Sequence, residues 1–127
     1  MECVGMSAYM LASSSILFAG TLQCQGKPAA DQKVQMMIKD KLMKAKVAST
    51  VSTDKTGQFK IQGNGDSERK KSAYLWIEHK CDPKERAGCT LTTYIPISKK
   101  HEGKEFRAGT RELSKNAHYN SCDDADN

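Results

Sequence analysis

Aromatic side chains are scarce in this sequence, at 6% of 127 residues, and no apolar stretch is long enough to cross a membrane as a helix. The chain also lacks a Cys-x-x-Cys pair, and its three histidines have no ligand partner at the spacing of a zinc finger. We therefore expect no transmembrane segment, no metal site and no cofactor.

Motifs of catalysis and of nucleic-acid binding are lacking as well. No Gly-x-Ser-x-Gly sequence and no recognisable serine–histidine–carboxylate set occurs. The chain has four arginines, none of them in an arginine-rich element, and no recognisable aromatic stacking platform. We expect neither an enzyme nor a nucleic-acid-binding protein. N-linked glycans are not expected either, since no Asn-x-Ser/Thr sequon is present.

The sequence does contain five cysteines, a high number for a small domain. Cysteines at this density, without metal-ligand spacing, indicate disulfide bonds and an oxidising compartment. Residues 1–15 are predicted to be a signal peptide or a disordered N-terminus, because an apolar run precedes the small residues 12–15, although Glu2 stands where a basic residue is usual. Loss of this segment removes Cys3 and leaves an even number of cysteines. We therefore expect a secreted, extracellular protein.

Short alternating segments separated by turn residues predict an all-β fold, an antiparallel immunoglobulin-like β-sandwich of about seven strands in residues 16–122, followed by an acidic tail at 123–127. A turn from Asp54 to Gly57 predicts that the third and fourth strands form a hairpin. The predicted strands are residues 16–24, 33–39, 47–53, 58–62, 73–81, 90–97 and 105–113.

The strand with the only tryptophan is predicted to lie at the centre of a sheet, because both of its faces carry large side chains. Leu75 and Ile77 point to one face, and Tyr74 and Trp76 to the other. His79 shares the face of Leu75. It is predicted to be a hydrogen-bonded core residue rather than a catalytic base, which would need a partner in reach.

The loop between Cys81 and Cys89 is the first candidate binding element. Asp82 followed by a proline is typical of a helix start, and Gly88 of a stop, so one short helical turn is predicted here. The candidate binding loop consists of the charged residues Lys84, Glu85 and Arg86.

A lysine-rich region is the second candidate. The formal net charge is +5, and basic residues crowd into residues 27–71. Such a surface favours an anionic lipid, a glycan or an acidic protein, and a solvated, solubilising lysine surface is the alternative interpretation. A monomer that contacts a protein or an anionic surface is the working expectation. The candidate basic patch comprises Lys39, Lys41, Lys44, Lys46, Lys70 and Lys71.

Four motifs, taken in order, resemble the transthyretin-like family of nematodes. They are Gly20-Thr-Leu-Gln-Cys24-Gln-Gly-Lys-Pro-Ala29, Ser52-Thr-Asp-Lys-Thr-Gly-Gln-Phe59, Leu75-Trp-Ile-Glu-His-Lys-Cys81, and Gly109-Thr110 with Leu113 and Cys122. The resemblance extends from Ile16 to Cys122. It implies a secreted transthyretin-type β-sandwich with a short helix between Cys81 and Cys89.

The resemblance also bears on catalysis. Transthyretin relatives include hydroxyisourate hydrolases, whose site combines His, Arg and His with a C-terminal Tyr-Arg-Gly-Ser. This chain ends in Asp-Asp-Ala-Asp-Asn and has no histidine in its first predicted strand. The catalytic pattern is absent, so the resemblance does not imply a hydrolase here.

The four cysteines left after removal of Cys3 allow three pairings. We prefer Cys24 with Cys122 and Cys81 with Cys89, because these bonds hold elements that are otherwise poorly fixed. Two hypotheses for function follow. The first is an extracellular binding module for an anionic lipid or glycan, a hydrophobic small molecule or a host protein. The second is a protease-inhibitor-like protein that presents the loop between Cys81 and Cys89.

Overall fold

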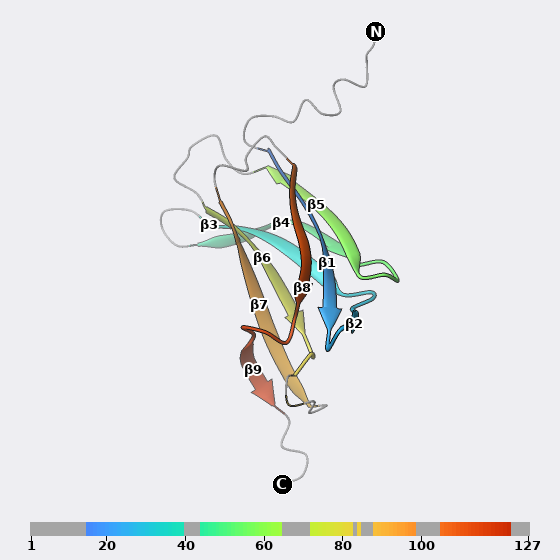
Figure 1. Cartoon of the computed structure of the whole chain (residues 1–127). Coiled ribbons are helices and arrows are strands. Elements are labelled where there is room, and N and C mark those ends of the chain that lie inside the picture. Colours follow the sequence, from blue (N-terminus) through green and yellow to red (C-terminus); the bar gives the residue numbers. More distant parts are fainter. Residues whose placement is uncertain are drawn as a thin grey trace.

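The computed structural model describes residues 15–39, 44–64, 72–82, 84, 88–98 and 105–122. These residues form nine β-strands and no helix (Figure 1). The strands are β1 (Ser15–Cys24), β2 (Lys27–Pro28), β3 (Lys33–Lys39), β4 (Ala45–Ser52), β5 (Gln58–Asn64), β6 (Ser72–His79), β7 (Cys89–Ile97), β8 (Glu105–Glu112) and β9 (His118–Cys122). All seven predicted strands are present, and sequence reasoning missed the short β2 and β9.

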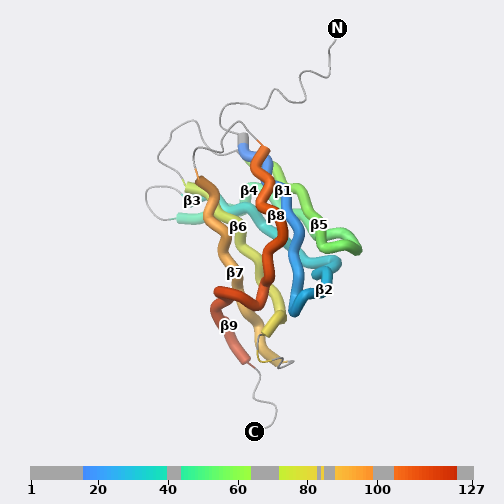
Figure 2. Tube along the Cα trace, in the orientation of Figure 1, coloured from blue at the N-terminus to red at the C-terminus, as the bar shows by residue number. Residues whose placement is uncertain are grey.

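The strands make two sheets. In the four-stranded sheet, β1 pairs antiparallel with β2 and β5 and parallel with β8. The five-stranded sheet has the order β4-β3-β6-β7-β9, and all its pairs are antiparallel. Figures 1 and 2 both show β8 running beside β1 and β9 beside one end of β7. The predicted β-sandwich and the central position of β6 are confirmed.

The hydrophobic core lies between the sheets, because alternate residues of each strand point inward. Phe18 of β1 is fully buried and contacts the ring of Phe106 at a centroid distance of 5.1 Å. The other large buried side chains of the core are Ile16, Leu22, Phe59 and Ile61 from the four-stranded sheet, and Val34, Met36, Leu75, Ile77, Ile95 and Ile97 from the five-stranded sheet.

The predicted hairpin is wrong, although its turn is right. The Gly57 amide donates to the Asp54 carbonyl at 3.0 Å, as in a β-turn. However, β4 pairs with β3 and β5 pairs with β1, so the turn carries the chain from one sheet to the other. Gly57 permits this path: its φ is +83°, and a Cβ there would lie 2.4 Å from the carbonyl oxygen of Leu22. Alternation alone does not distinguish a hairpin from such a crossing.

Several predictions fall outside the described residues. These are the N-terminal signal segment, most of the helical turn predicted between Cys81 and Cys89, and the acidic tail. Within the described part of the chain, no helix is long and apolar enough to cross a membrane.

Candidate functional site

All four predicted disulfide cysteines are bonded, but the preferred pairing is wrong. Cys24 pairs with Cys81, with Cα atoms 5.7 Å apart, and Cys89 pairs with Cys122, with Cα atoms 3.9 Å apart. The first bond joins the end of β1 to Cys81, two residues after the end of β6, and so links the two sheets. The second joins residues directly opposite each other on β7 and β9. Sequence reasoning missed it because β9 was not recognised as a strand.

The candidate binding loop is therefore anchored differently from the prediction. No disulfide joins its two ends to each other. Instead Cys81 fixes one end to β1, and Cys89 fixes the other end to β9. Lys84 is exposed, and its amide donates to the Asp82 carboxylate at 2.9 Å. Glu85 and Arg86 lie outside the described residues.

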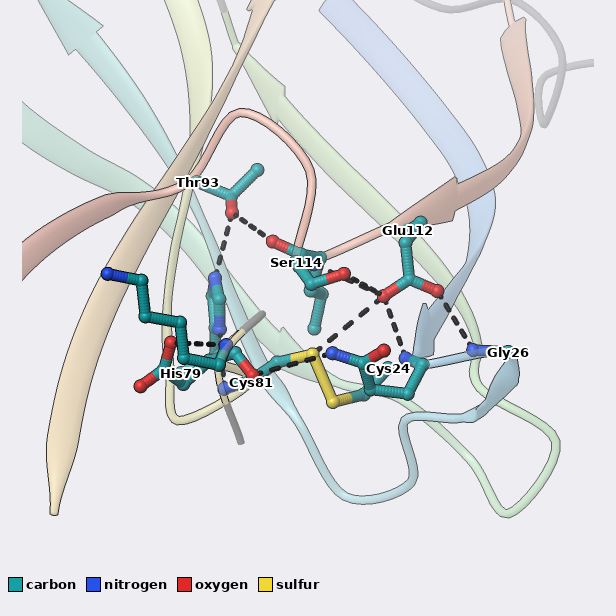
Figure 3. Close-up of a disulfide and its surroundings, with 11 residues drawn as sticks. Cys24, Gly26, His79, Cys81, Thr93, Glu112 and Ser114 are labelled. Carbon is teal, nitrogen blue, oxygen red and sulfur yellow. Dashed lines mark hydrogen bonds between the residues drawn. A yellow bond between two sulfur atoms is a disulfide. The ribbon is translucent and has the colours of Figure 1, made fainter. Parts of the chain in front are cut away.

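Glu112, which sequence reasoning did not single out, ties the end of β8 to the turn after β1 beside the Cys24–Cys81 disulfide (Figure 3). Its carboxylate accepts from the amides of Gln25 and Gly26 at 2.8 and 3.0 Å and from the Ser114 hydroxyl at 2.7 Å. Gln25 and Gly26 have φ values of 55° and 78°, so the turn aims both amides at one side chain. Burial alone would raise the pKa of Glu112, but these hydrogen bonds lower it to about 2.

His79 is a core residue, as predicted. It is 4% exposed; its Nε2 lies 2.8 Å from the Thr93 hydroxyl, and its Nδ1 accepts from the Cys81 amide at 3.0 Å. Burial lowers the pKa of His79 to about 4, so the ring is neutral at physiological pH. Both ring nitrogens are engaged within the protein, an arrangement that holds the end of β6 against β7.

Asp82 completes this region. It is 3% exposed, and its carboxylate accepts from the Tyr119 hydroxyl of β9. The side-chain amide of Gln25 donates to the Asp82 carbonyl at 3.4 Å. We call this region the cross-linked end: the two disulfides with Gln25, Gly26, His79, Asp82, Glu112 and Ser114.

The described lysines of the basic patch do not share one face. Lys46 lies opposite Ile38, and Lys39 lies opposite Ala45. Because successive residues of a strand point to opposite faces, Lys39 and Lys46 point to opposite faces of the sheet. Lys44, before β4, is exposed. The remaining predicted members, Lys41, Lys70 and Lys71, lie outside the described residues.

Lys39 belongs to a different feature, a line of side chains across the outer face of the five-stranded sheet. Its Nζ lies 5.8 Å from the ring centroid of Tyr74. The Tyr74 and Tyr94 centroids are 5.8 Å apart, and those of Tyr94 and His118 are 6.0 Å apart. These residues come from β3, β6, β7 and β9, which are neighbours in the sheet. We call Tyr74, Tyr94 and His118 the aromatic row, with Lys39 at one end.

Polar groups accompany the aromatic row. The Thr92 hydroxyl accepts from the indole N–H of Trp76 at 3.5 Å and from the Asn120 side-chain amide at 2.6 Å. Tyr94 is 50% exposed, whereas Thr92 is 1% exposed. Burial raises the pKa of Tyr74, and the neighbouring Tyr94 raises it further. The phenol of Tyr74 is therefore held in its neutral form more strongly than that of a free tyrosine.

Sequence reasoning missed this face, because its rings come from three separate strands. One signal was available in the sequence. Two strands, β6 and β7, each alternate buried apolar residues with outward-facing ones, and each has an aromatic residue at an outward position. Register then decides whether such rings meet. Trp76 lies opposite Tyr94, which places Tyr74 and Tyr94 on a diagonal of the sheet.

A concave surface lies on the four-stranded sheet. A hollow of about 560 Å³ is lined by parts of β1, β5, β8 and the turn after β4. It forms where Ala19 and Thr21 lie opposite Arg107 and Thr110, so that β8 has one extra residue there. Its charges are mixed: Arg107 Nε lies 3.1 Å from Glu105 Oε2 on the same strand. A hollow with balanced charges gives no signal for a ligand of either sign.

Metal binding was not expected from the sequence. Within the described residues, no group of three or more histidine, cysteine, aspartate or glutamate side chains is placed to hold a metal ion.

Comparison with known proteins agrees with this fold. The sequence profile of the transthyretin-like family matches residues 19–97. The chain is similar to transthyretin-like protein 16 of Caenorhabditis elegans, with 32% identity over 69 residues that cover 54% of this chain and 52% of that protein. The match thus spans about half the length of this curated relative.

A solved structure shares the fold at low identity. The chain is similar to part of a 9R-lipoxygenase from Cyanothece PCC8801, with a TM-score of 0.51 and 12% identity over 80% of this chain and 17% of the lipoxygenase. At this identity the likeness concerns the fold alone. The family match, by contrast, covers most of both sheets, from β1 to β7. This chain belongs to the transthyretin-like family.

Proposed function

We propose that this protein is a secreted, non-enzymatic binding module that holds an anionic extracellular ligand on the outer face of its five-stranded sheet. The observation that carries the proposal is the placement of the Lys39 ammonium group at the end of the aromatic row. A cation beside open aromatic rings offers one ligand both a partner for its acidic group and an apolar surface for the rest of it.

An extracellular location is supported by the two disulfides, because such bonds persist in oxidising compartments. One of them joins the two sheets and the other holds β9 at the sheet edge. Reduction would therefore loosen both sheets. A protein built in this way is suited to work outside the cell.

The charge distribution supports an anionic ligand. On the outer face of β6, the described carboxylate is Glu78, which is four residues from Tyr74. At about 3.3 Å per residue, Glu78 lies roughly 13 Å along the strand from the tyrosine that Lys39 contacts. Glu78 is therefore too far from Lys39 to form an ion pair with it, and the positive charge of Lys39 dominates its end of the aromatic row.

The test compares Lys39→Gln with Lys60→Gln, which removes the same charge from the exposed side of β5 in the other sheet. Binding to heparin and to vesicles that contain phosphatidylserine is measured at roughly 50 mM and 500 mM NaCl. We expect salt to weaken binding, and Lys39→Gln to weaken it about three- to fivefold, the effect of one exposed charge pair. The control should bind like the wild type. Equal affinity at both salt concentrations contradicts the proposal.

A second candidate function is inhibition of a trypsin-like protease by the loop between Cys81 and Cys89. It is favoured by the anchoring of both loop ends through separate disulfides and by the hydrogen bond from the Lys84 amide to Asp82. Restricted loops bind proteases with a small loss of conformational entropy. A trypsin-like enzyme would recognise Lys84 or Arg86, so substitution of both by alanine should abolish inhibition of trypsin, and failure of the wild type to slow trypsin disposes of this candidate.

A further inference from the structure

We infer that the ligand of the aromatic row is an acidic polysaccharide, whose sugar rings stack on Tyr74 and Tyr94 and on the adjacent Trp76 while Lys39 pairs with a sulfate or carboxylate group. This inference rests on the proposed function and names its ligand class. It follows from the geometry of the row, from the polar groups around it, and from the number of lysines on this face.

The row is long and open. Together with Lys39 it crosses four adjacent strands, and neighbouring strands lie about 4.8 Å apart, so the distance from Lys39 to His118 across the sheet is roughly 14 Å. The exposed fraction of Tyr94, at 50%, leaves its ring accessible from solvent. An extended chain of sugar rings can lie along such a line. A small hydrophobic molecule fits it poorly, since such ligands prefer enclosed pockets.

The surrounding chemistry matches a sugar. The C–H faces of a pyranose ring are apolar and pack on aromatic rings, while its hydroxyl groups need hydrogen-bond partners. Here the side-chain amides of Asn120 and Gln35 flank the aromatic residues, bonded to Thr92 and Thr50. Their remaining hydrogen-bonding capacity, with the Tyr94 hydroxyl, is available to sugar hydroxyls.

The same face is less suited to an anionic membrane. Lipid surfaces are recognised by clusters of about four to eight basic residues. The described outer positions of β3 carry two, Lys33 and Lys39. Met37, between them and opposite Tyr74, is 6% exposed, and the exposed apolar side chain next to it is one valine, Val47 of β4, which gives a bilayer little to surround. One cation beside a row of rings instead fits an acidic group attached to a sugar.

The test measures affinity by calorimetry for three probes: a size-defined heparin oligosaccharide, a dextran oligosaccharide of equal length, and vesicles of phosphatidylcholine with phosphatidylserine. Two substitutions of Tyr94 separate the effect of ring stacking on affinity from the effect of side-chain size. Tyr94→Trp keeps an aromatic ring, and Tyr94→Leu keeps an apolar side chain without one. Unchanged far-ultraviolet circular dichroism verifies that each variant is folded.

We expect the heparin oligosaccharide to bind more tightly than dextran, with Tyr94→Trp within about twofold of the wild type and Tyr94→Leu about tenfold weaker. Binding to the vesicles but not to the oligosaccharide overturns this inference and leaves the proposed function standing. So does equal affinity of Tyr94→Leu and the wild type for heparin. Binding to none of the anionic probes overturns both.

Discussion

At the cross-linked end, His79 and Asp82 are 4% and 3% exposed, whereas Tyr94 on the outer face of the five-stranded sheet is 50% exposed. The buried polar groups are paired with other parts of the chain: His79 with Thr93, and the Asp82 carboxylate with Tyr119. The rings of the aromatic row lie beside one another and face solvent. Burial with partners points to a structural role, and exposure of a large ring points to contact with something outside the chain.

This difference assigns roles to residues that look alike in the sequence. His79 and Tyr94 both occur within strands that alternate between apolar and polar positions. The face to which each points separates them. We therefore expect substitutions at the cross-linked end to change stability, and substitutions in the aromatic row to change binding.

The largest expected effect is the loss of the Cys24–Cys81 disulfide. The double substitution Cys24→Ser with Cys81→Ser opens a loop of 57 residues, which the chain-entropy model values at about 4 kcal/mol. Urea denaturation of both proteins measures the difference in free energy of unfolding. A loss below about 1 kcal/mol would contradict the role given to this end of the sandwich.

The next effect is a dependence of stability on pH. The pKa of His79 is lowered from 6.5 to about 4, so as pH falls below 6.5 the unfolded chain takes up the proton first. The stability contributed by neutral His79 is complete above pH 6.5 and is lost progressively toward pH 4. Between about pH 7 and pH 5 the loss is about 2 kcal/mol.

Denaturation at a series of pH values tests this dependence. His79→Gln keeps a hydrogen-bonding side chain and removes the titrating group, so its stability should vary less with pH in this range. The same slope in the variant and the wild type would assign the effect to another group. Glu112, with its pKa lowered to about 2, contributes a separate loss as pH falls below 4.5.

A smaller effect is expected from Glu112→Gln. The amide side chain loses the charge that favours hydrogen bonds from Gln25, Gly26 and Ser114, so we expect a loss of about 1 to 2 kcal/mol. The matched control is Glu105→Gln, which removes a carboxylate whose described partner is the exposed Arg107. Its loss should stay below about 0.5 kcal/mol. Thermal or urea denaturation measures both losses of stability. Equal losses for Glu112→Gln and Glu105→Gln would contradict the structural role of Glu112.

The smallest effect on stability is expected from Tyr94→Leu. Tyr94 is 50% exposed, and among the described core residues none is hydrogen-bonded to its hydroxyl, so the free energy of unfolding should change by about 0.5 kcal/mol or less. The same variant is expected to lose affinity for the heparin oligosaccharide. A large loss of stability, of the size seen for a buried ring, would place Tyr94 with the structural residues.

Much of the fold could be predicted from the sequence, because alternation and turn residues are local signals. The strand with Trp76 lies at the centre of its sheet, and His79 is buried on the core side, both as expected. The hairpin at Asp54 and the disulfide pairing were wrong, because each depends on which distant strand is the neighbour. Cys24 meets Cys81 only once the ends of β1 and β6 lie across the sandwich from each other.

The candidate site was less predictable for the same reason. Glu112 gives no local signal, since its partners lie 86 and 87 residues away at Gly26 and Gln25. The aromatic row needs the register of β6, β7 and β9, and Tyr74 meets Tyr94 only once β6 pairs with β7. The predicted basic patch combined lysines by position in the sequence, and alternation separates Lys39 from Lys46.

The most direct test of the binding face uses Trp76, the only tryptophan in the chain, which lies opposite Tyr94 on that face. Its fluorescence emission is followed while the heparin oligosaccharide is added to the oxidised protein. We predict a saturable change in the intensity or wavelength of emission, with the same dissociation constant as calorimetry. Saturable binding by calorimetry with unchanged Trp76 emission would place the ligand elsewhere and contradict the account.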